Sequence, residues 1–177
     1  MLTKILVVLL VVVAGFLAYA STRPDTLRVQ RSATIKAPPD KIFPLITDLR
    51  RWSVWSPWEK KDPAMKRTFG GVDSGQGAVY AWQGNSDVGE GRMEIVEVTP
   101  PSKVAIQLDF IKPLEGHNVA EFTLTPKGEA TDVTWLMYGP TPFIGKVLGI
   151  FMNMDAMIGN DFEAGLASLK AVAEKSP

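Results

Sequence analysis

The amino-acid sequence predicts an α+β fold in which an antiparallel β-sheet is wrapped around a long C-terminal α-helix. Two observations lead to this expectation. Consecutive short segments between residues 27 and 138 alternate apolar with polar residues, and turn-forming segments separate them, as in an antiparallel meander. Beyond residue 150, apolar residues recur at steps of three and four, as on one face of an α-helix. Because the apolar face of a sheet has to be covered, we expect this helix to pack against it.

The composition limits the classes of function. The chain has 177 residues, of which 46% are hydrophobic, which suits one domain with a core and an appendage. Its formal net charge is zero and it has no basic run, so we expect no nucleic-acid partner. The absence of cysteine excludes disulfides, thiol catalysis and thiolate metal sites. With His117 as the single histidine, we expect no metal site, no Ser-His-Asp triad and no cofactor.

The N-terminal segment has the composition of a membrane helix. Residues 5–20 are apolar without interruption and follow Lys4. As a helix, this run spans roughly 24 Å, somewhat less than the ~30 Å hydrocarbon core of a bilayer. Leu2 and Thr3 extend the run, and the Lys4 side chain can reach the headgroups, so the length is compatible with a single span.

Residues 18–20, Ala-Tyr-Ala, provide an alternative, because small residues at this spacing also end a cleavable signal peptide. We therefore predict that residues 1–22 form a transmembrane anchor or signal segment and that residues 23–177 form the folded domain; a buried helix is the third alternative. An anchor gives a single-pass membrane protein with an extracytoplasmic domain. Cleavage gives a secreted or periplasmic protein. The flanking charges do not settle the orientation.

Within the domain, the alternation of apolar and polar residues predicts strands, and a short helix over residues 42–49 follows the first of them. Residues 59–76 are polar and glycine-rich, so we expect a loop or a weak strand there. One strand changes its apolar face near Ile95, which predicts a β-bulge. The strands are predicted at residues 27–36, 77–83, 89–99, 103–112, 118–126 and 131–138.

Residues 51–58 concentrate three tryptophans in a segment that Pro57 interrupts. Tryptophan has a broad apolar body and one N–H donor, so it suits a packed core and a ligand pocket equally. We keep both interpretations: a plug that closes the end of the sheet, or one or two rings that line a cavity.

The C-terminal stretch, residues 143–173, supplies the covering helix. Its first part, residues 143–151, is apolar nearly all round, so it is either buried or a gate that contacts lipid. Gly145 and Gly149 form a GxxxG pair, for which we expect a close approach to the sheet or to the tryptophan segment. The buried stripe of the helix is predicted at Phe151, Met154, Ile158, Phe162, Leu166, Leu169 and Val172.

Bulky aromatic residues and methionines dominate the faces that would meet between sheet and helix, where valine and leucine would suffice for a core. Methionine adapts to irregular space, and ligand pockets are mostly apolar. For any single residue a filled core is the alternative. The candidate cavity residues are Trp55, Trp58, Tyr80, Trp82, Met93, Phe110, Phe122, Trp135, Met137, Met154, Met157 and Phe162.

Few ionisable residues are candidates for chemistry, and we assign no catalytic residue. Glu90 and Glu94 would share a strand face about 13–14 Å apart, too far for a paired-carboxylate site. Asp155 is either a polar group at a cavity mouth or a charge that stabilises the start of a helix. Together with Tyr80, it is the candidate that an enzyme would use.

Three segments carry a resemblance to a known superfamily. Residues 37–43 (APPDKIF), which follow the first strand, resemble the entrance to the first helix of the SRPBCC superfamily, also called START-like or Bet v 1-like. Residues 52–58 (WSVWSPW) are similar to a segment of its polyketide cyclase/dehydrase-like branch, and residues 161–170 resemble its closing helix. The resemblance implies a helix-grip fold around a hydrophobic cavity. It implies no single chemistry and no catalytic residue.

Three functional hypotheses follow from these observations. The first is a domain tethered at a membrane that binds a hydrophobic small molecule or lipid between the sheet and the C-terminal helix. The second is a polyketide cyclase- or dehydratase-like enzyme with an ionisable group in the cavity. The third is a non-enzymatic interaction domain with a filled core, whose protein partners are unknown.

Overall fold

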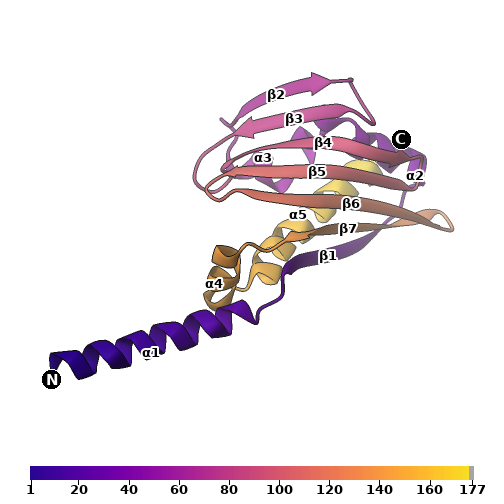
Figure 1. The fold of residues 1–177 in the computed structure, drawn as a ribbon. Coiled ribbons are helices and arrows are strands. Elements are labelled where there is room, and N and C mark those ends of the chain that lie inside the picture. The colour runs from indigo at the N-terminus through magenta and orange to yellow at the C-terminus, as the bar shows by residue number, and fades with distance from the viewer. Residues whose placement is uncertain (176–177) are drawn as a thin grey trace.

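The computed structural model describes residues 1–175, and the last two residues of the predicted domain 23–177 lie outside that range. Helix α1 (Leu2–Ser21) projects from the rest of the chain as a separate rod (Figure 1). Its side chains are almost all exposed, and Ala20 near its end is buried. Its length and apolar composition are those that a membrane span requires.

Within residues 1–175, a seven-stranded antiparallel sheet forms the body of the domain, which confirms the predicted fold class. Strands β2 to β7 lie beside one another in chain order, and β1 pairs with β7, so the order is β1-β7-β6-β5-β4-β3-β2 (Figure 1). The strands are β1 (Thr26–Ile35), β2 (Lys66–Gly71), β3 (Ala78–Gln83), β4 (Glu90–Thr99), β5 (Lys103–Lys112), β6 (Gly116–Lys127) and β7 (Ala130–Pro140).

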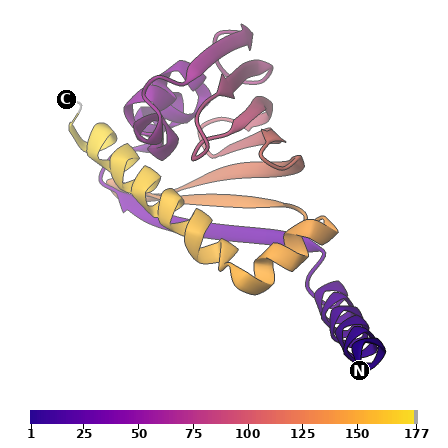
Figure 2. The same cartoon turned by 90° about the vertical axis from the view of Figure 1, so that its left-hand side faces the viewer.

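Helices lie on one side of this sheet, and the long helix α5 runs across it (Figure 2). Its most extensive contacts with the sheet are to β1, and Phe162, Leu166 and Leu169 are buried there. The sheet and its covering helix are therefore those of the predicted helix-grip architecture. The helical segments after α1 are α2 (Pro39–Thr47), the 3-10 helix η1 (Leu49–Val54), α3 (Pro57–Lys61), α4 (Phe143–Phe151) and α5 (Met154–Lys175).

The C-terminal stretch differs from the prediction, because it is two helices and the buried stripe does not include Phe151. Helix α4 ends where Met152 adopts an extended conformation. The Asn153 side chain then accepts a hydrogen bond from the Ala156 backbone N–H at 3.0 Å and caps the start of α5. Phe151 is consequently 74% exposed.

Residues 59–76 contain more structure than the expected loop or weak strand. The expected weak strand is β2. The segment also contains the end of helix α3, which the sequence does not predict. Helix α3 begins at Pro57, whose fixed φ suits the first turn of a helix. A helix of five residues is too short to show a helical period in the sequence.

The predicted bulge in β4 is confirmed. The register between β4 and β5 shifts after Ile95, which pairs with Ile106, so that Val98 pairs with Val104. Val96 is the extra residue and is exposed, whereas Val98 returns to the side that packs against the core.

An ion-pair cluster holds α5 in its direction across the sheet. Arg31 projects from the inner side of β1 and pairs with Asp155 at 3.0 Å and with Glu163 at 2.8 Å. Gly159 lies between these carboxylates on the helix, and a Cβ there would collide with the Arg31 guanidinium. Because glycine has no side chain, the Arg31 guanidinium can lie directly against the helix at this position.

Candidate functional site

An open cleft lies between the sheet and the N-terminal half of α5. Its volume is about 370 Å³, within the range of about 300–1,000 Å³ typical of small-molecule sites. Strands β5 and β7 contribute Leu108, Phe110 and Met137, and α5 contributes Met157 and Phe162. The walls are mostly apolar, so the cleft favours an apolar ligand.

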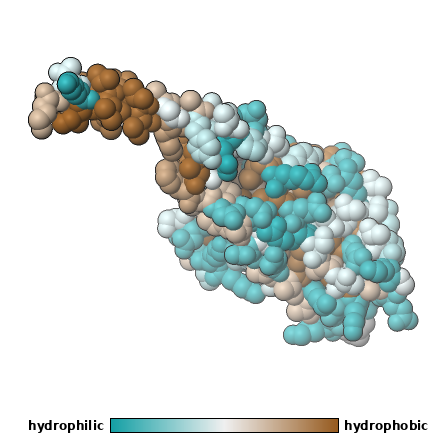
Figure 3. All heavy atoms as spheres, turned by 90° about the horizontal axis from the view of Figure 1, so that it is seen from below, coloured by the Kyte–Doolittle hydropathy of each residue, from teal (hydrophilic) through white to brown (hydrophobic). Residues whose placement is uncertain are grey.

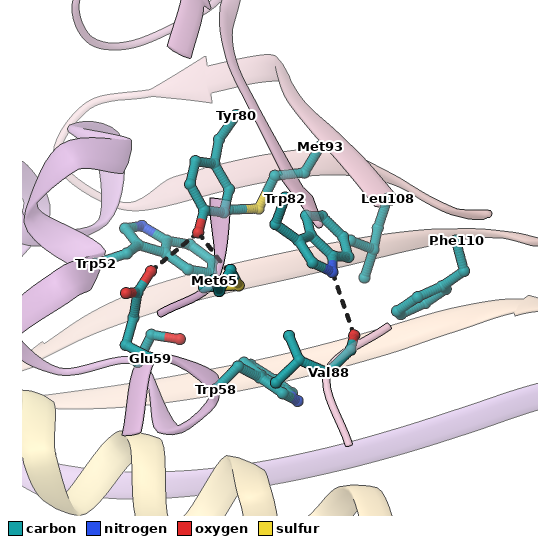
Figure 4. A pocket seen from close by; sticks show the side chains of 11 residues that line it. Trp52, Trp58, Glu59, Met65, Tyr80, Trp82, Val88, Met93, Leu108 and Phe110 are labelled. Atoms are coloured by element: carbon teal, nitrogen blue, oxygen red, sulfur yellow. Dashed lines mark hydrogen bonds between the residues drawn. The ribbon is translucent and has the colours of Figure 1, made fainter. Parts of the chain in front are cut away.

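A smaller pocket of about 70 Å³ adjoins this cleft (Figure 4). The two spaces share lining residues, so one elongated ligand can occupy both. The shared residues are Trp52, Trp58, Val88, Met93, Leu108 and Phe110. The pocket is lined in addition by Ser56, Glu59, Met65, Tyr80 and Trp82.

The candidate cavity residues separate into two groups. Trp55 and Phe122 line neither space and are fully buried. The others line one space or both: Trp58, Tyr80, Trp82, Met93 and Phe110 the pocket, and Trp58, Met93, Phe110, Trp135, Met137, Met154, Met157 and Phe162 the cleft. That a ligand touches them stays a prediction.

The interior is filled beside the cleft by stacked rings. The Trp135 ring on β7 stacks on Phe162 of α5 with their centroids 4.1 Å apart. The Phe122 ring, directly opposite Trp135 on the adjacent strand β6, lies 4.7 Å from it. Trp55 packs 5.6 Å from Trp135 and donates its indole N–H to the Leu45 carbonyl oxygen at 2.9 Å. The filled-core interpretation therefore holds for Trp55 and Phe122.

Both interpretations of the tryptophan segment apply, each to different rings. Trp55 is the plug described above. Trp52 donates its indole N–H to the Ile46 carbonyl oxygen at 3.0 Å, which fixes the ring while one side of it lines the pocket. Trp58 lines both spaces. Because η1 and α3 lie against α5 and β3, they carry these rings to the cavity wall.

The pocket wall contains a carboxylate that the sequence prediction missed. Glu59 Oε1 accepts a hydrogen bond from the Tyr80 hydroxyl at 2.9 Å (Figure 4). Its Oε2 accepts from Arg67 Nε at 2.8 Å and from Arg67 Nη2 at 2.6 Å. Glu59 lies in the segment that the sequence predicts as a loop or weak strand. The one sequence feature that could have placed Glu59 at the cavity is its position directly after Trp58.

Tyr80 is held in its protonated form by these surroundings. Burial and the neighbouring Glu59 carboxylate raise the pKa of the Tyr80 phenol. The hydroxyl therefore acts as a hydrogen-bond donor to Glu59 and does not supply a phenolate base.

Asp155 is placed outside the cleft and the pocket. It pairs with Arg31, and the hydrogen bond from the Arg31 guanidinium lowers the pKa of the Asp155 carboxyl group. This carboxylate serves to hold α5 on β1, at the first turn of the helix. Of the two ionisable candidates, Tyr80 lies at the pocket and Asp155 does not.

The orientation of Trp82 depends on a glycine in the adjacent strand. A Cβ on Gly91 would collide with the Trp82 ring and lie 2.7 Å from the Asp109 carbonyl oxygen. The Trp82 indole N–H donates to the Val88 carbonyl oxygen at 3.2 Å, and its ring meets Phe110 edge-on at 6.1 Å. Gly91 thus allows the ring to lie flat along β4 as part of the pocket wall.

The GxxxG pair does not make the expected close approach. A Cβ on Gly149 would meet nothing within 4 Å, and one on Gly145 would meet only Thr141 and Pro142, the residues just before α4. Helix α4 packs against α1 instead of the tryptophan segment, and the Phe16 and Phe151 rings lie 5.8 Å apart.

The comparison with protein families assigns the chain. The family described as polyketide cyclase / dehydrase and lipid transport matches residues 26–174. The chain therefore belongs to this family, which confirms the resemblance to the SRPBCC superfamily. No curated protein matches the sequence at a significant level.

Solved structures share the fold. Protein CV1439 from Chromobacterium violaceum is 17% identical with a TM-score of 0.60, over 87% of this chain and 100% of that one. The Aha1 dimer from Colwellia psychrerythraea is 18% identical with a TM-score of 0.60, over 84% and 97%. The di-domain ARO/CYC StfQ from the steffimycin biosynthetic pathway is 13% identical with a TM-score of 0.63, over 85% and 51%. Identities this low establish the fold alone.

Proposed function

We propose that the domain binds a hydrophobic small molecule or lipid in the cleft between the sheet and α5. The observation that carries this proposal is the mostly apolar cleft of about 370 Å³ at a place where close packing is the rule for a core. Removing apolar ligand surface from water would stabilise the complex by ~25 cal/mol per Å². The family description, which includes lipid transport, supports this class of ligand.

The tether in this proposal is residues 1–22, with residues 23–177 as an extracytoplasmic binding domain. Helix α1 supports it, because its apolar side chains are exposed to the surroundings and not packed in the domain. Cleavage after Ala20 is the alternative and would release the domain as a secreted or periplasmic protein.

Helix α4 is the part of the domain that we place against the membrane. None of its residues is buried, and Phe143 and Ile144 are each 49% exposed. Its contact with α1 makes the two apolar surfaces continuous (Figure 3). Met157 lies in the first turn of α5, which follows α4 in the chain, and it lines the cleft and is 47% exposed. In this proposal a lipid therefore enters the cleft from the bilayer side.

Tryptophan fluorescence tests the binding proposal directly. Every tryptophan lies between residues 52 and 135, and bromine quenches indole fluorescence on contact. We expect ω-bromododecanol to quench the full-length chain in amphipol with saturation. A linear, unsaturable response would show that the probe only partitions into the amphipol and would contradict the proposal.

A cavity-filling variant and a matched control locate the site. Leu108 lines both spaces, so Leu108→Phe should weaken saturable quenching at least about tenfold. Ile111 is on the same strand and 51% exposed, so Ile111→Phe should leave quenching unchanged. Circular dichroism checks that both variants fold, because overpacking costs about 1–3 kcal/mol.

A polyketide cyclase- or dehydratase-like enzyme is the second candidate function. The observation that favours it is Glu59, an ionisable group on the pocket wall beside Tyr80. Such an enzyme needs a positioned acid or base within hydrogen-bond reach of the substrate. Incubation of the wild type with linear aromatic polyketide precursors, with Glu59→Gln as control, tests it by mass spectrometry. Products that are equal in both reactions would remove this candidate.

A further inference from the structure

The smaller pocket combines an apolar wall with one charged cluster. The Glu59 side chain is only 9% exposed, and the Arg67 guanidinium neutralises it. Ser56 and Tyr80 are the other polar residues of the wall, and the remaining lining residues are apolar. A buried charge of this kind is costly unless all its hydrogen-bonding positions are used. The arrangement therefore raises the question of what completes the cluster.

The hydrogen-bond capacity left over in this cluster is that of an acceptor. A carboxylate oxygen accepts two hydrogen bonds, and among the described residues Glu59 Oε1 receives one, from Tyr80. The single Tyr80 proton is used in that bond. Arg67 Nε and Nη2 are directed at Glu59, and Nη1 donates to the Met65 carbonyl oxygen at 2.6 Å.

The other polar groups of the wall do not change this balance. The Trp82 indole N–H is occupied by the Val88 carbonyl oxygen at 3.2 Å. The Ser56 hydroxyl both donates and accepts, so it does not discriminate between ligands.

We infer that Glu59 is a ligand-binding residue that accepts a hydrogen bond from the hydroxyl group of an otherwise apolar alcohol. The inference rests on the proposed function and deepens it, because it assigns the ligand class. The hydroxyl end occupies the pocket of about 70 Å³, and the apolar body extends into the adjoining cleft of about 370 Å³. A free carboxylate at this end is disfavoured, because Glu59 repels it. The other guanidinium edge of Arg67, Nη1 and Nη2, is directed at the Pro63 carbonyl oxygen at 3.4 Å and is not free to pair with it.

A set of brominated probes with the same chain and different ends tests this inference. The probes are ω-bromododecanol, ω-bromododecanoate and bromododecane, titrated at neutral pH into the full-length chain in amphipol. A hydrogen bond to a charged group predicts that the alcohol binds about tenfold more tightly than the alkane. The carboxylate should bind more weakly than the alcohol by at least the same factor.

Variants assign the preference to Glu59. Glu59→Gln should reduce the alcohol-to-carboxylate ratio to within about threefold, because the charge that repels the carboxylate is gone. Tyr80→Phe should keep the preference, because the acceptor remains. Glu94→Gln is the matched control, since Glu94 pairs with Arg92 at 2.6 Å on β4 and neither residue lines the pocket or the cleft. The ratio is measured within each variant, so partial unfolding cancels.

The outcomes separate this inference from the proposed function. Equal affinity for the three probes, or a preference that survives in Glu59→Gln, would overturn the inference while leaving hydrophobic binding intact. Quenching that does not saturate with any probe would overturn the proposed function itself. Should Glu59→Gln fail to fold, Glu59→Gln combined with Arg67→Gln removes both charges of the pair and gives the same readout.

Discussion

At the residue scale, the pocket exists because a small residue faces a large one. The Trp82 ring lies against Gly91 of β4. A residue with a Cβ at this position would collide with the ring. The ring then reaches both its hydrogen-bond partner, the Val88 carbonyl oxygen, and the edge of Phe110. This contact keeps the Trp82 ring on the pocket wall.

Gly91→Ala should therefore displace Trp82 and reduce binding. The added methyl group would collide with the ring, which has to rotate into the pocket, and overpacking of this kind costs about 1–3 kcal/mol. We expect quenching by ω-bromododecanol to weaken at least about tenfold. Gly70→Ala in β2 is the control, because its methyl group would meet only Val79 at 3.9 Å. Equal quenching in both variants would show that Trp82 does not shape the site.

The sequence predicts residues of the cavity well where strand alternation applies. Tyr80 and Trp82 are two residues apart in one strand, and Phe110 continues the set of every second residue that begins at Val104, so their side of the sheet follows from the period of two. Glu59 could not be found in this way, because α3 has no readable period and the carboxylate meets Tyr80 and Arg67 only through the tertiary fold. Trp55 and Phe122 are bulky aromatic residues like the other cavity candidates. Neighbouring rings pack against them, so they are fully buried and line no cavity.

At the scale of elements, α5 is brought close to the ring cluster by a second small residue. A Cβ on Gly165 would lie 2.8 Å from the Trp135 ring and 3.1 Å from Pro57. Neither neighbour can move away easily, because the Trp135 ring is stacked on Phe162 and Pro57 is a rigid ring at the start of α3. The spacing between α5 and the sheet, and hence the depth of the cleft, follows from this contact.

Gly165→Ala should destabilise the domain, although alanine favours a helix over glycine by about 1 kcal/mol. The collision with Trp135 should outweigh that gain and lower the free energy of unfolding by about 1–3 kcal/mol. Gly149→Ala in α4 is the matched control. Its methyl group would meet nothing within 4 Å, so stability should rise or stay unchanged. Urea unfolding of both variants measures the difference, and a stabilising Gly165→Ala would contradict the packing described for α5.

The sequence pattern predicts most of the strands and the C-terminal helix correctly. The bulge near Ile95 is confirmed, because a change of apolar face within one strand has few other causes. The break between α4 and α5 could not be predicted, because apolar residues keep a helical spacing of three and four residues across Phe151. What ends α4 is the extended backbone of Met152 and the Asn153 cap, both local features inside an apolar pattern.

At the scale of the whole molecule, α1 and α4 form one continuous apolar surface beside the cleft (Figure 3). Arg23 and Arg28 line a groove next to this surface, together with Lys146, which pairs with Asp25. Basic side chains close to a bilayer are attracted to anionic headgroups. These basic side chains support the proposed orientation, in which α4 lies against the membrane.

The absence of cysteine allows a clean test of this orientation. We expect an environment-sensitive fluorophore on Ile144→Cys, in α4, to be shielded from an aqueous quencher when the full-length chain is in liposomes. The same label on Val72→Cys, which lies between β2 and β3 and is 50% exposed, should be quenched fully. Equal quenching at both positions would place α4 in water and contradict the orientation.

Native mass spectrometry of the full-length chain, released from its own membrane, tests most directly whether the cleft holds an apolar molecule. We expect the wild-type protein to carry a noncovalent small-molecule mass that collisional activation releases as an apolar compound. Leu108→Phe, which fills the cleft, should lose this mass, and Ile111→Phe should retain it. A bare protein mass for the wild type, or the same bound mass in Leu108→Phe, would contradict binding in the cleft.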